Sequence, residues 1–431
     1  MTCQSNRSGL TLIELIVALT VLCIAMALVV PAVQRAREHA RSESCRNNLR
    51  VIGVALYTFV TADPQDRLCS GAFDPRRDGS PDTYGWVADV IKIQGGNPNE
   101  LRCVANPVQG LSALNDLIER DAAEFDGSVP ADRRNVGRAG AGWPELPGLP
   151  TTAGSPARTQ QVARFVREGY NTNYSASWYL VRAQPQISTN HDEFFAEVHN
   201  GDYWGGMFID LSSAPPGGDL RDLSATHGPL TRRLIERAET PSGNIPLLGD
   251  SAASAASKPL SNGLLEESGW EWLSSKQHSA GAASFSDGPA YWKVDHIQRL
   301  DQSAPIKSVV PRKMPTLNSR VRDETPFASA SSMPDGQHRL VLQDTRNWYA
   351  VHGRKAHLLM ADGGVKSLQD WNGDGFFNPG FPIDESIARE SLQLDVGYSD
   401  SRREIDSFDV HVSALFNPKA MRGRVCILYA E

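Results

Sequence analysis

The sequence has no excess of positive charge, and that absence limits its partners. Its 431 residues include 43 lysines and arginines against 50 aspartates and glutamates, which gives a formal net charge of −7 at pH 7. Proteins that bind nucleic acids present a basic field or patch to the phosphates. The chain has no such global field, and we expect no nucleic-acid partner.

The common signatures of catalysis are also missing. The chain contains no Gly-x-Ser-x-Gly, His-Glu-x-x-His, P-loop or Gly-x-Gly-x-x-Gly sequence. Each of these motifs places a nucleophile, a metal or a phosphate group in a defined local geometry. With no recognisable catalytic constellation, the sequence favours a protein that is not an enzyme.

One long apolar run stands near the start of the chain, at residues 10–33. As a helix it would span about 36 Å, enough to cross a hydrocarbon core of about 30 Å. Its single charge, Glu14, costs roughly 2.5–3.5 kcal/mol on insertion scales and implies a partner. We therefore predict one transmembrane segment with an acidic residue near its start.

At these residues the sequence resembles the type IV pilins and the pseudopilins of type II secretion. The resemblance lies in Gly9, Leu10 and Glu14, in a short polar leader that contains Arg7, and in Pro31. It implies that a prepilin peptidase cuts between Gly9 and Leu10 and methylates the new amino group of Leu10. It also implies that Glu14 pairs with the N-terminus of a neighbouring prepilin-type subunit.

The resemblance implies a single-pass protein of the bacterial inner membrane, with its C-terminal domain in the periplasm or on the cell surface. The alternative is a plain signal anchor with an incidental glutamate. The predicted organisation is a leader (1–9), the membrane half of a spine helix (10–33), its exported amphipathic half (34–61), an exported α+β region with insertions (62–338) and C-terminal antiparallel strands (339–431). In the exported half of the helix, one apolar stripe is formed by Cys45, Leu49, Ile52, Leu56 and Phe59.

Several short sequences resemble one branch of this superfamily, a large bacterial family of unknown function with a C-terminal His-x9-Asp-Gly motif. They are residues 36–41, residues 45–49, Arg102-Cys103, Asn173-Tyr174, Gly249-Asp250, and His352 followed by Asp362-Gly363. The chain departs from the family pattern at Val104, Asp250 and Gly364. None of these departures touches the cleavage site.

The fold class that we predict is α+β, with a long spine helix followed by an exported domain on an antiparallel sheet. Aromatic and β-branched stretches predict strands at residues 170–183, 204–211, 245–249 and 289–294. In the last hundred residues, strands of an antiparallel sheet are expected at 339–343, 357–361, 365–368, 409–416 and 425–430, with Asp362-Gly363 as a hairpin turn. Residues 62–83 are expected to form a surface loop, and a short helix is expected after Pro229.

Residues 370–375, Asp-Trp-Asn-Gly-Asp-Gly, resemble the opening of a calcium loop. Oxygen-bearing side chains alternate at Asp370, Asn372 and Asp374, as hard cations require. Phe381 stands where an EF-hand has its bidentate glutamate, so the Phe376 carbonyl, water or Asp384 would complete the site. The alternative is an Asx-rich turn that uses the same residues.

Other candidate ligands and crosslinks are fewer. His352, His357 and Asp362 could be imagined on a metal, but a strand would place the two imidazoles on opposite faces. Cys45, Cys69, Cys103 and Cys426 lie in the exported part and allow three disulfide pairings, among which we prefer Cys69 with Cys103.

The sequence thus favours a structural, pseudopilin-like subunit of a type IV filament or a type II secretion system. The rival is a membrane-tethered extracellular enzyme, or a protein that binds carbohydrate or peptide, that uses the prepilin route only for export. In the rival, tryptophans such as Trp86, Trp178, Trp204, Trp270, Trp272 and Trp292 would line a groove.

Overall fold

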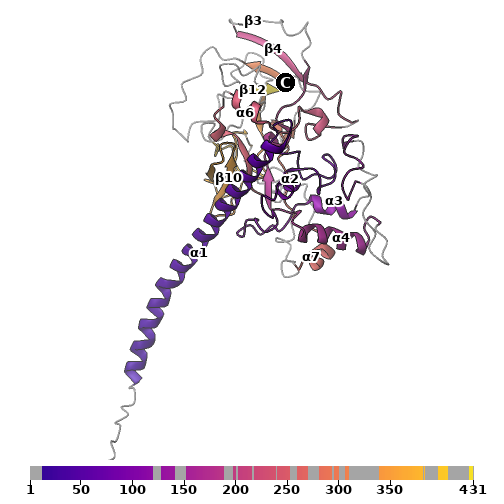
Figure 1. Cartoon of the computed structure of the whole chain (residues 1–431). Helices are drawn as coiled ribbons and strands as arrows, with labels where there is room; N and C mark the ends of the chain where they lie inside the picture. Colours follow the sequence, from indigo (N-terminus) through magenta and orange to yellow (C-terminus); the bar gives the residue numbers. More distant parts are fainter. Residues whose placement is uncertain are drawn as a thin grey trace, which may run out of the picture.

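A computed structural model describes residues 12–119, 128–140, 152–188, 198–199, 202–215, 218–238, 240–252, 260–269, 281–293, 296–299, 306–309, 339–381, 383, 397–405 and 427–430. The described part begins with helix α1 (Leu12–Ala62), which is 51 residues long and passes through Pro31 without a break. Figure 1 shows that one half of α1 extends away from the molecule and the other half lies against the domain.

The two halves of α1 differ in burial as the sequence predicts. In the N-terminal half the large apolar side chains face outward, and Leu12, Val21 and Leu28 are 77, 60 and 71 % exposed. In the second half the predicted apolar stripe is confirmed. Its members, Cys45, Leu49, Ile52, Leu56 and Phe59, are all buried. One helix therefore presents an apolar rod and then becomes a core element.

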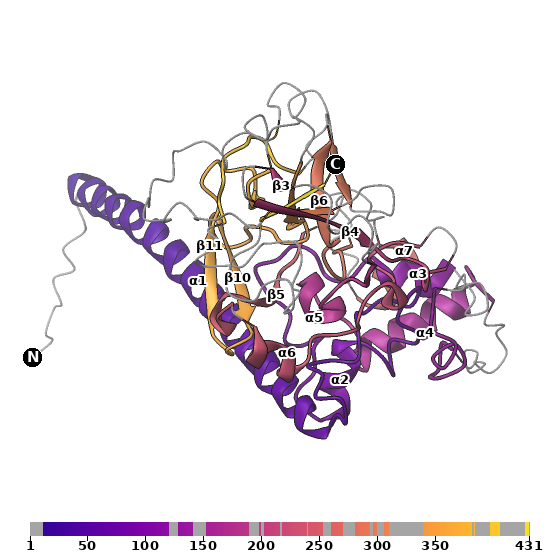
Figure 2. The same ribbon diagram turned by 90° about the horizontal axis from the view of Figure 1, so that it is seen from above.

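The second half of α1 packs against a four-stranded antiparallel sheet. The order of its strands is β1 (Tyr174–Ala176), β5 (Pro246–Asp250), β10 (Lys355–Met360) and β11 (Val365–Gln369). Figure 2 shows β10 and β11 running beside α1. The contact is close at Gly53, where an added Cβ would lie 2.8 Å from Leu359 Cδ1.

The predicted turn at Asp362-Gly363 is confirmed, because it joins the paired strands β10 and β11. Gly363 has a φ of 80°, which glycine adopts without strain. The side chain of Asp362 accepts a hydrogen bond from the Gly364 amide at 2.7 Å. Local turn chemistry thus determines this hairpin.

Among the described residues a second antiparallel sheet lies farther from the membrane half of α1. Its strands are β2 (Ile187–Ser188), β4 (Asp202–Ile209), β8 (Ile306–Val309), β12 (Ile427–Ala430), β9 (Arg339–Gln343), β6 (Pro289–Lys293) and β7 (His296–Arg299), with β3 (Val198–His199) paired to β4. The C-terminal strands therefore do not form one sheet: β10 and β11 join the first sheet, whereas β9 and β12 join the second. Residues 409–416 lie outside the described part.

The remaining helices are short. They are α2 (Trp86–Lys92), α3 (Ala113–Glu119), α4 (Pro156–Arg167), α5 (Trp178–Arg182), α6 (Arg232–Arg237), α7 (Asn262–Glu267) and the 3₁₀ turns η2 (Leu223–Ala225) and η3 (Ser242–Asn244). The helix predicted after Pro229 is α6. Residues 170–183 are only partly a strand, because Ser177 ends the extended segment and caps α5 by accepting the Leu180 amide.

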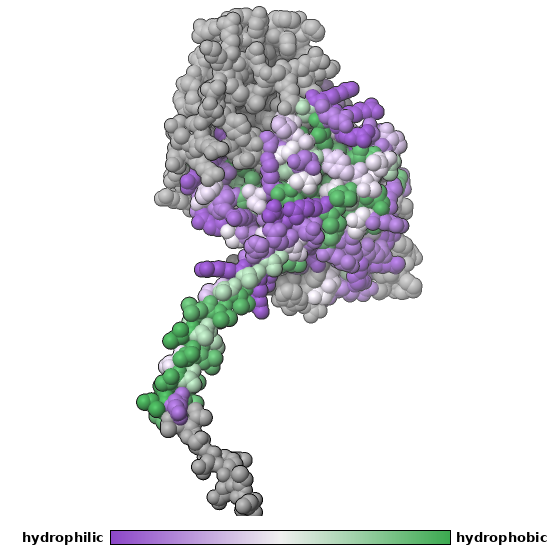
Figure 3. Space-filling model, turned by 60° about the vertical axis from the view of Figure 1, so that its left-hand side comes forward, coloured by the Kyte–Doolittle hydropathy of each residue, from purple (hydrophilic) through white to green (hydrophobic). Residues whose placement is uncertain are grey.

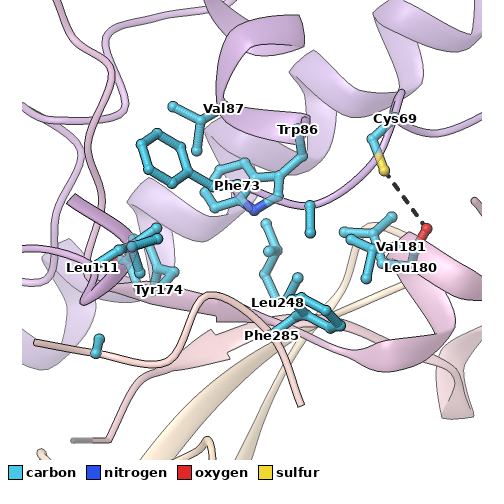
Figure 4. Packing of buried hydrophobic residues seen from close by; sticks show 14 of the residues in the cluster. Cys69, Phe73, Trp86, Val87, Leu111, Tyr174, Leu180, Val181, Leu248 and Phe285 are labelled. Atoms are coloured by element: carbon cyan, nitrogen blue, oxygen red, sulfur yellow. Dashed lines mark hydrogen bonds between the residues drawn. The ribbon is translucent and has the colours of Figure 1, made fainter. Parts of the chain in front are cut away.

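The core joins α1, the first sheet and the short helices. Figure 4 shows Phe73 and Trp86 packed beside Tyr174, Leu248 and Phe285. The prediction that residues 62–83 form a surface loop is wrong, because Leu68, Cys69 and Phe73 in this segment are fully buried. The segment is irregular in sequence but contributes apolar side chains to the core.

Candidate functional site

The apolar half of α1 is the first functional feature. Within the described residues, α1 is the one helix long and apolar enough to cross a membrane, and the apolar window is not buried inside the domain. Glu14 lies in the first turn of α1, and its side chain is exposed. Gly9 and Leu10 lie outside the described residues, so the predicted cleavage site stays a prediction.

The second feature is a cluster of four polar side chains in the interior. It consists of Cys45 of α1, Cys103 of the segment after α2, Asp250 at the end of β5 and His352 just before β10; we call it the buried cluster. One donor atom from each residue lies within 4.8 Å of the others. Their exposures are 0, 1, 0 and 4 % respectively.

Three distances define the geometry of the buried cluster. Cys45 Sγ donates to Asp250 Oδ1 at 3.0 Å. Cys103 Sγ lies 3.3 Å from His352 Nε2, and this nitrogen is 3.7 Å from Asp250 Oδ2. Two thiols, a carboxylate and one imidazole nitrogen thus converge on a common point.

Neighbouring groups hold these side chains in place. Asn173 bonds the backbone of Cys103 on both sides, since its Oδ1 accepts the amide at 2.8 Å and its Nδ2 donates to the carbonyl at 2.9 Å. Tyr174, which pairs with Asp250 across β1 and β5, places its hydroxyl 3.2 Å from Cys45 Sγ. The backbone amide of His357 donates to Asp250 Oδ2 at 2.8 Å.

Burial and close contact shift the pKa values of the buried cluster. The contact with Cys45 lowers the pKa of Cys103 to about 5, with a further contribution from His352, and the same contact raises the pKa of Cys45. Burial alone would lower the pKa of His352, but its contacts with Cys103 and Asp250 outweigh burial and raise the pKa to about 9. Burial raises the pKa of Asp250. The cluster therefore favours a thiolate at Cys103 beside a protonated His352.

The two histidines do not lie on opposite faces, as a strand through both would require. His352 precedes β10 in a turn, where its amide donates to the Lys355 carbonyl, and its ring lies 4.7 Å from that of His357. The expectation of opposite faces was wrong because only His357 belongs to the strand. The two ring nitrogens of His357 contact the hydroxyls of Ser42 and Ser367 at 2.7 and 2.8 Å. Of the two histidines, only His352 therefore belongs to the buried cluster.

The predicted disulfide between Cys69 and Cys103 is absent, because both are free thiols. Cys69 donates to the Leu180 carbonyl at 3.6 Å, as Figure 4 shows, and thus faces α5. Cys103 faces α1 and β5 instead, so the two thiols contact different parts of the core. Cys426 lies outside the described residues.

The predicted calcium loop is a compact turn after β11. Asp370 is buried, and its two oxygens accept the amides of Gly373 and Gly375 at 2.5 and 3.1 Å. Asp374 accepts the Phe376 amide at 2.8 Å. The side-chain amide of Asn372 donates to the Asp374 carboxylate at 3.0 Å and to the Asp400 carboxylate at 3.1 Å. Asp384 lies outside the described residues, and the calcium prediction stays a prediction.

Sequence reasoning missed the buried cluster, although a signal for it was present. Each of four short sequences that carry the family resemblance contributes one residue to the cluster: residues 45–49, Arg102-Cys103, Gly249-Asp250 and the histidine of His-x9-Asp-Gly. Asn173-Tyr174 supplies the groups that hold the cluster. Had these sequences been treated as parts of one site, the cluster would have been predictable as a set, though not its geometry.

An exposed apolar helix that continues into a folded domain gives the described part of the chain the architecture of an α+β domain on a candidate membrane-anchoring helix. Residues 4–30 match the prokaryotic N-terminal methylation motif, and residues 34–222 match the family of proteins of unknown function DUF1559. The chain therefore carries a prepilin-type N-terminal segment and is similar to the DUF1559 family over residues 34–222, as the sequence resemblance implied. No curated protein and no solved structure matches it.

Proposed function

We propose that this protein is a pseudopilin-like structural subunit of a type IV filament or a type II secretion system, and not an enzyme. The observation that carries the proposal is the division of α1 into an exposed apolar half and a half buried in the domain. Figure 3 shows the apolar half as a hydrophobic rod that projects from a domain whose coloured surface mixes hydrophilic and hydrophobic patches. Such a rod is stable in a bilayer or against the apolar rods of other subunits.

In this proposal, prepilin peptidase cleaves between Gly9 and Leu10 and methylates Leu10. The protein then stays in the bacterial inner membrane, with its domain in the periplasm or on the cell surface. Glu14 pairs with the N-terminus of a neighbouring prepilin-type subunit, because each charge offsets the burial of the other in an apolar environment.

The rival function, a tethered enzyme or a protein that binds carbohydrate or peptide, has less support. Trp86 and Trp178, two of the side chains that would line its groove, are fully buried in the core. The side chains of Trp204, Trp270 and Trp272 lie outside the described part. The buried cluster, the strongest concentration of reactive groups among the described residues, is closed to a substrate.

We also propose that the loop around Asp370, Asn372 and Asp374 binds calcium. The observation in favour is Asp400, a carboxylate that the tertiary structure adds to the loop through its contact with Asn372. The Phe376 carbonyl and Asp384 remain the other candidate ligands. Calcium would reduce the repulsion between these carboxylates.

The test of the main proposal is mass spectrometry of the protein isolated from cells that contain prepilin peptidase. We expect a chain that begins at methylated Leu10. Gly9→Val should leave an uncut precursor in the membrane, whereas Ser8→Ala, one residue away, should be processed normally. A mature chain that begins beyond Ala32 would contradict the proposal, because an ordinary signal peptidase cuts after the apolar run.

A further inference from the structure

The buried cluster has the composition of a structural zinc site. Two cysteine thiols, one histidine nitrogen and one carboxylate are ligands that Zn²⁺ accepts, and four protein ligands without an open position are typical of structural sites. The ligands come from α1, the segment after α2, β5 and the turn before β10. Their donor atoms lie within 4.8 Å of one another.

Three separations in the buried cluster are close to the edges of a zinc tetrahedron. Bond lengths of about 2.3 Å to sulfur and about 2.0–2.2 Å to nitrogen and oxygen give edges of roughly 3.4–3.8 Å. The observed separations are 3.0 Å from Cys45 Sγ to Asp250 Oδ1, 3.3 Å from Cys103 Sγ to His352 Nε2, and 3.7 Å from that nitrogen to Asp250 Oδ2. All four donor atoms lie within 4.8 Å of one another, so shifts of up to about 1 Å would bring them to the edges of the tetrahedron.

The side chains around the buried cluster include hydrogen-bonding groups of the kind that orient metal ligands. The second nitrogen of His352, Nδ1, lies 3.4 Å from the carboxylate of Glu38. Histidine ligands of metals commonly donate this other N–H to a carboxylate, which fixes the ring and the nitrogen that faces the metal. The Tyr174 hydroxyl contacts Cys45 Sγ, and the His357 backbone amide donates to Asp250, so two of the three anionic ligands keep a hydrogen bond.

We propose that Cys45, Cys103, Asp250 and His352 bind one Zn²⁺ ion as a structural site that fastens α1 to the exported domain. Binding forms four metal–ligand bonds, to two thiolates, one carboxylate and one neutral imidazole, and any protons that these groups carry in the metal-free protein go to solvent. The proposal does not depend on the proposed function, since an anchored protein outside any filament would need the same link between helix and domain.

Two other uses of the cluster fit less well. A disulfide between Cys45 and Cys103 would use both thiols. Asp250 would then lose its contact with the Cys45 thiol, and His352 would lose its contact with the Cys103 thiol. A Cys–His nucleophile needs access for a substrate, and Cys103 is only 1 % exposed. Asp250 and Cys103 also approach the same nitrogen of His352, whereas in a catalytic triad the acid and the nucleophile bind different nitrogens.

The test is the metal content of the full-length protein, purified in detergent with protected thiols and saturated with zinc before desalting. We expect one zinc per chain in the unmodified protein and background levels in Cys103→Ser and Asp250→Ala. The matched controls are Cys69→Ser, a buried thiol outside the cluster, and His357→Gln, the adjacent imidazole. Both should keep one zinc per chain.

A second measurement on the unmodified protein covers the case in which the variants do not fold. Cobalt in place of zinc should give the visible absorption of a tetrahedral site with thiolate ligands, and a chelator should lower the melting temperature. The proposal is overturned by an unmodified protein without bound zinc, by loss of zinc in the two controls as well, or by an octahedral cobalt spectrum. A Cys45–Cys103 disulfide in protein alkylated directly from cells would overturn it too, as would rapid alkylation of Cys103 in the zinc-saturated protein.

Discussion

Among the described residues, the most deeply buried ion pair joins Arg182 of α5 to Asp78, with 2.7 Å between Nη2 and Oδ2 and no exposure of either side chain. Removal of one partner would leave the other charge buried without compensation, which costs about 3–5 kcal/mol. We therefore expect Asp78→Ala to lower the free energy of unfolding by that amount in denaturant titrations. Glu43→Ala, which breaks the exposed Arg46–Glu43 pair, should cost less than about 1 kcal/mol. Equal losses in the two variants would contradict this interpretation.

Asp89 predicts a pH dependence of stability. Its side chain is buried, and burial raises its pKa from the ordinary 3.8 to about 7, although bonds from Ser70 act in the opposite direction. Between these two values the folded protein keeps a proton that the unfolded chain has lost. This stabilising contribution is complete below about pH 4 and is lost as the pH rises through about 7.

The variant Asp89→Asn isolates this effect. The difference in unfolding free energy between the unmodified protein and the variant should become less favourable to the unmodified protein from pH 4 to pH 7, by about 1.4 kcal/mol for each unit of pKa shift. Asp132→Asn, at an exposed position, should leave the slope unchanged. Parallel stability profiles for Asp89→Asn and the unmodified protein would show that Asp89 does not hold the proton.

At the scale of elements, the loop after β11 tests the calcium proposal. Extracellular calcium modules bind at roughly 10⁻⁴–10⁻³ M, and a ligand at 100 times its dissociation constant stabilises a protein by about 2.7 kcal/mol. The protein should therefore melt at a higher temperature in 10 mM calcium than in calcium-free buffer, with the same zinc concentration and no chelator in both. Asp374→Ala should abolish the difference, and Asp362→Ala, in the neighbouring hairpin turn, should not. Identical melting temperatures of the unmodified protein would reduce the loop to an Asx turn.

At the scale of the whole molecule, α1 connects two environments, and Glu14 tests what surrounds its apolar half. Glu14→Ala should be cleaved and methylated normally but should be lost from sheared filaments or from complexes with other prepilin-type subunits. Glu43→Ala, an acidic residue on the exported half of the same helix, should assemble like the unmodified protein. Unchanged recovery of Glu14→Ala would show that the protein is anchored without an assembly partner.

The sequence by itself determined the features that depend on neighbouring residues. The apolar run at residues 10–33, the stripe from Cys45 to Phe59 and the Asp362-Gly363 turn are local patterns, and the structure contains the helix, its buried face and the hairpin. The α+β class with antiparallel sheets followed from the same periodicities.

Only the tertiary structure decided which distant residues meet. Cys45 contacts Asp250 across 205 residues of sequence, and Cys103 contacts His352 across 249. No periodicity indicates such a separation. From the sequence we preferred a Cys69–Cys103 bridge among three possible pairings and placed His352 and His357 on opposite faces of a strand. The contacts arise because α1 packs on β10 while β5 lies between β1 and β10. Sheet order and helix packing are fixed by burial of the whole core, and this determines the buried cluster.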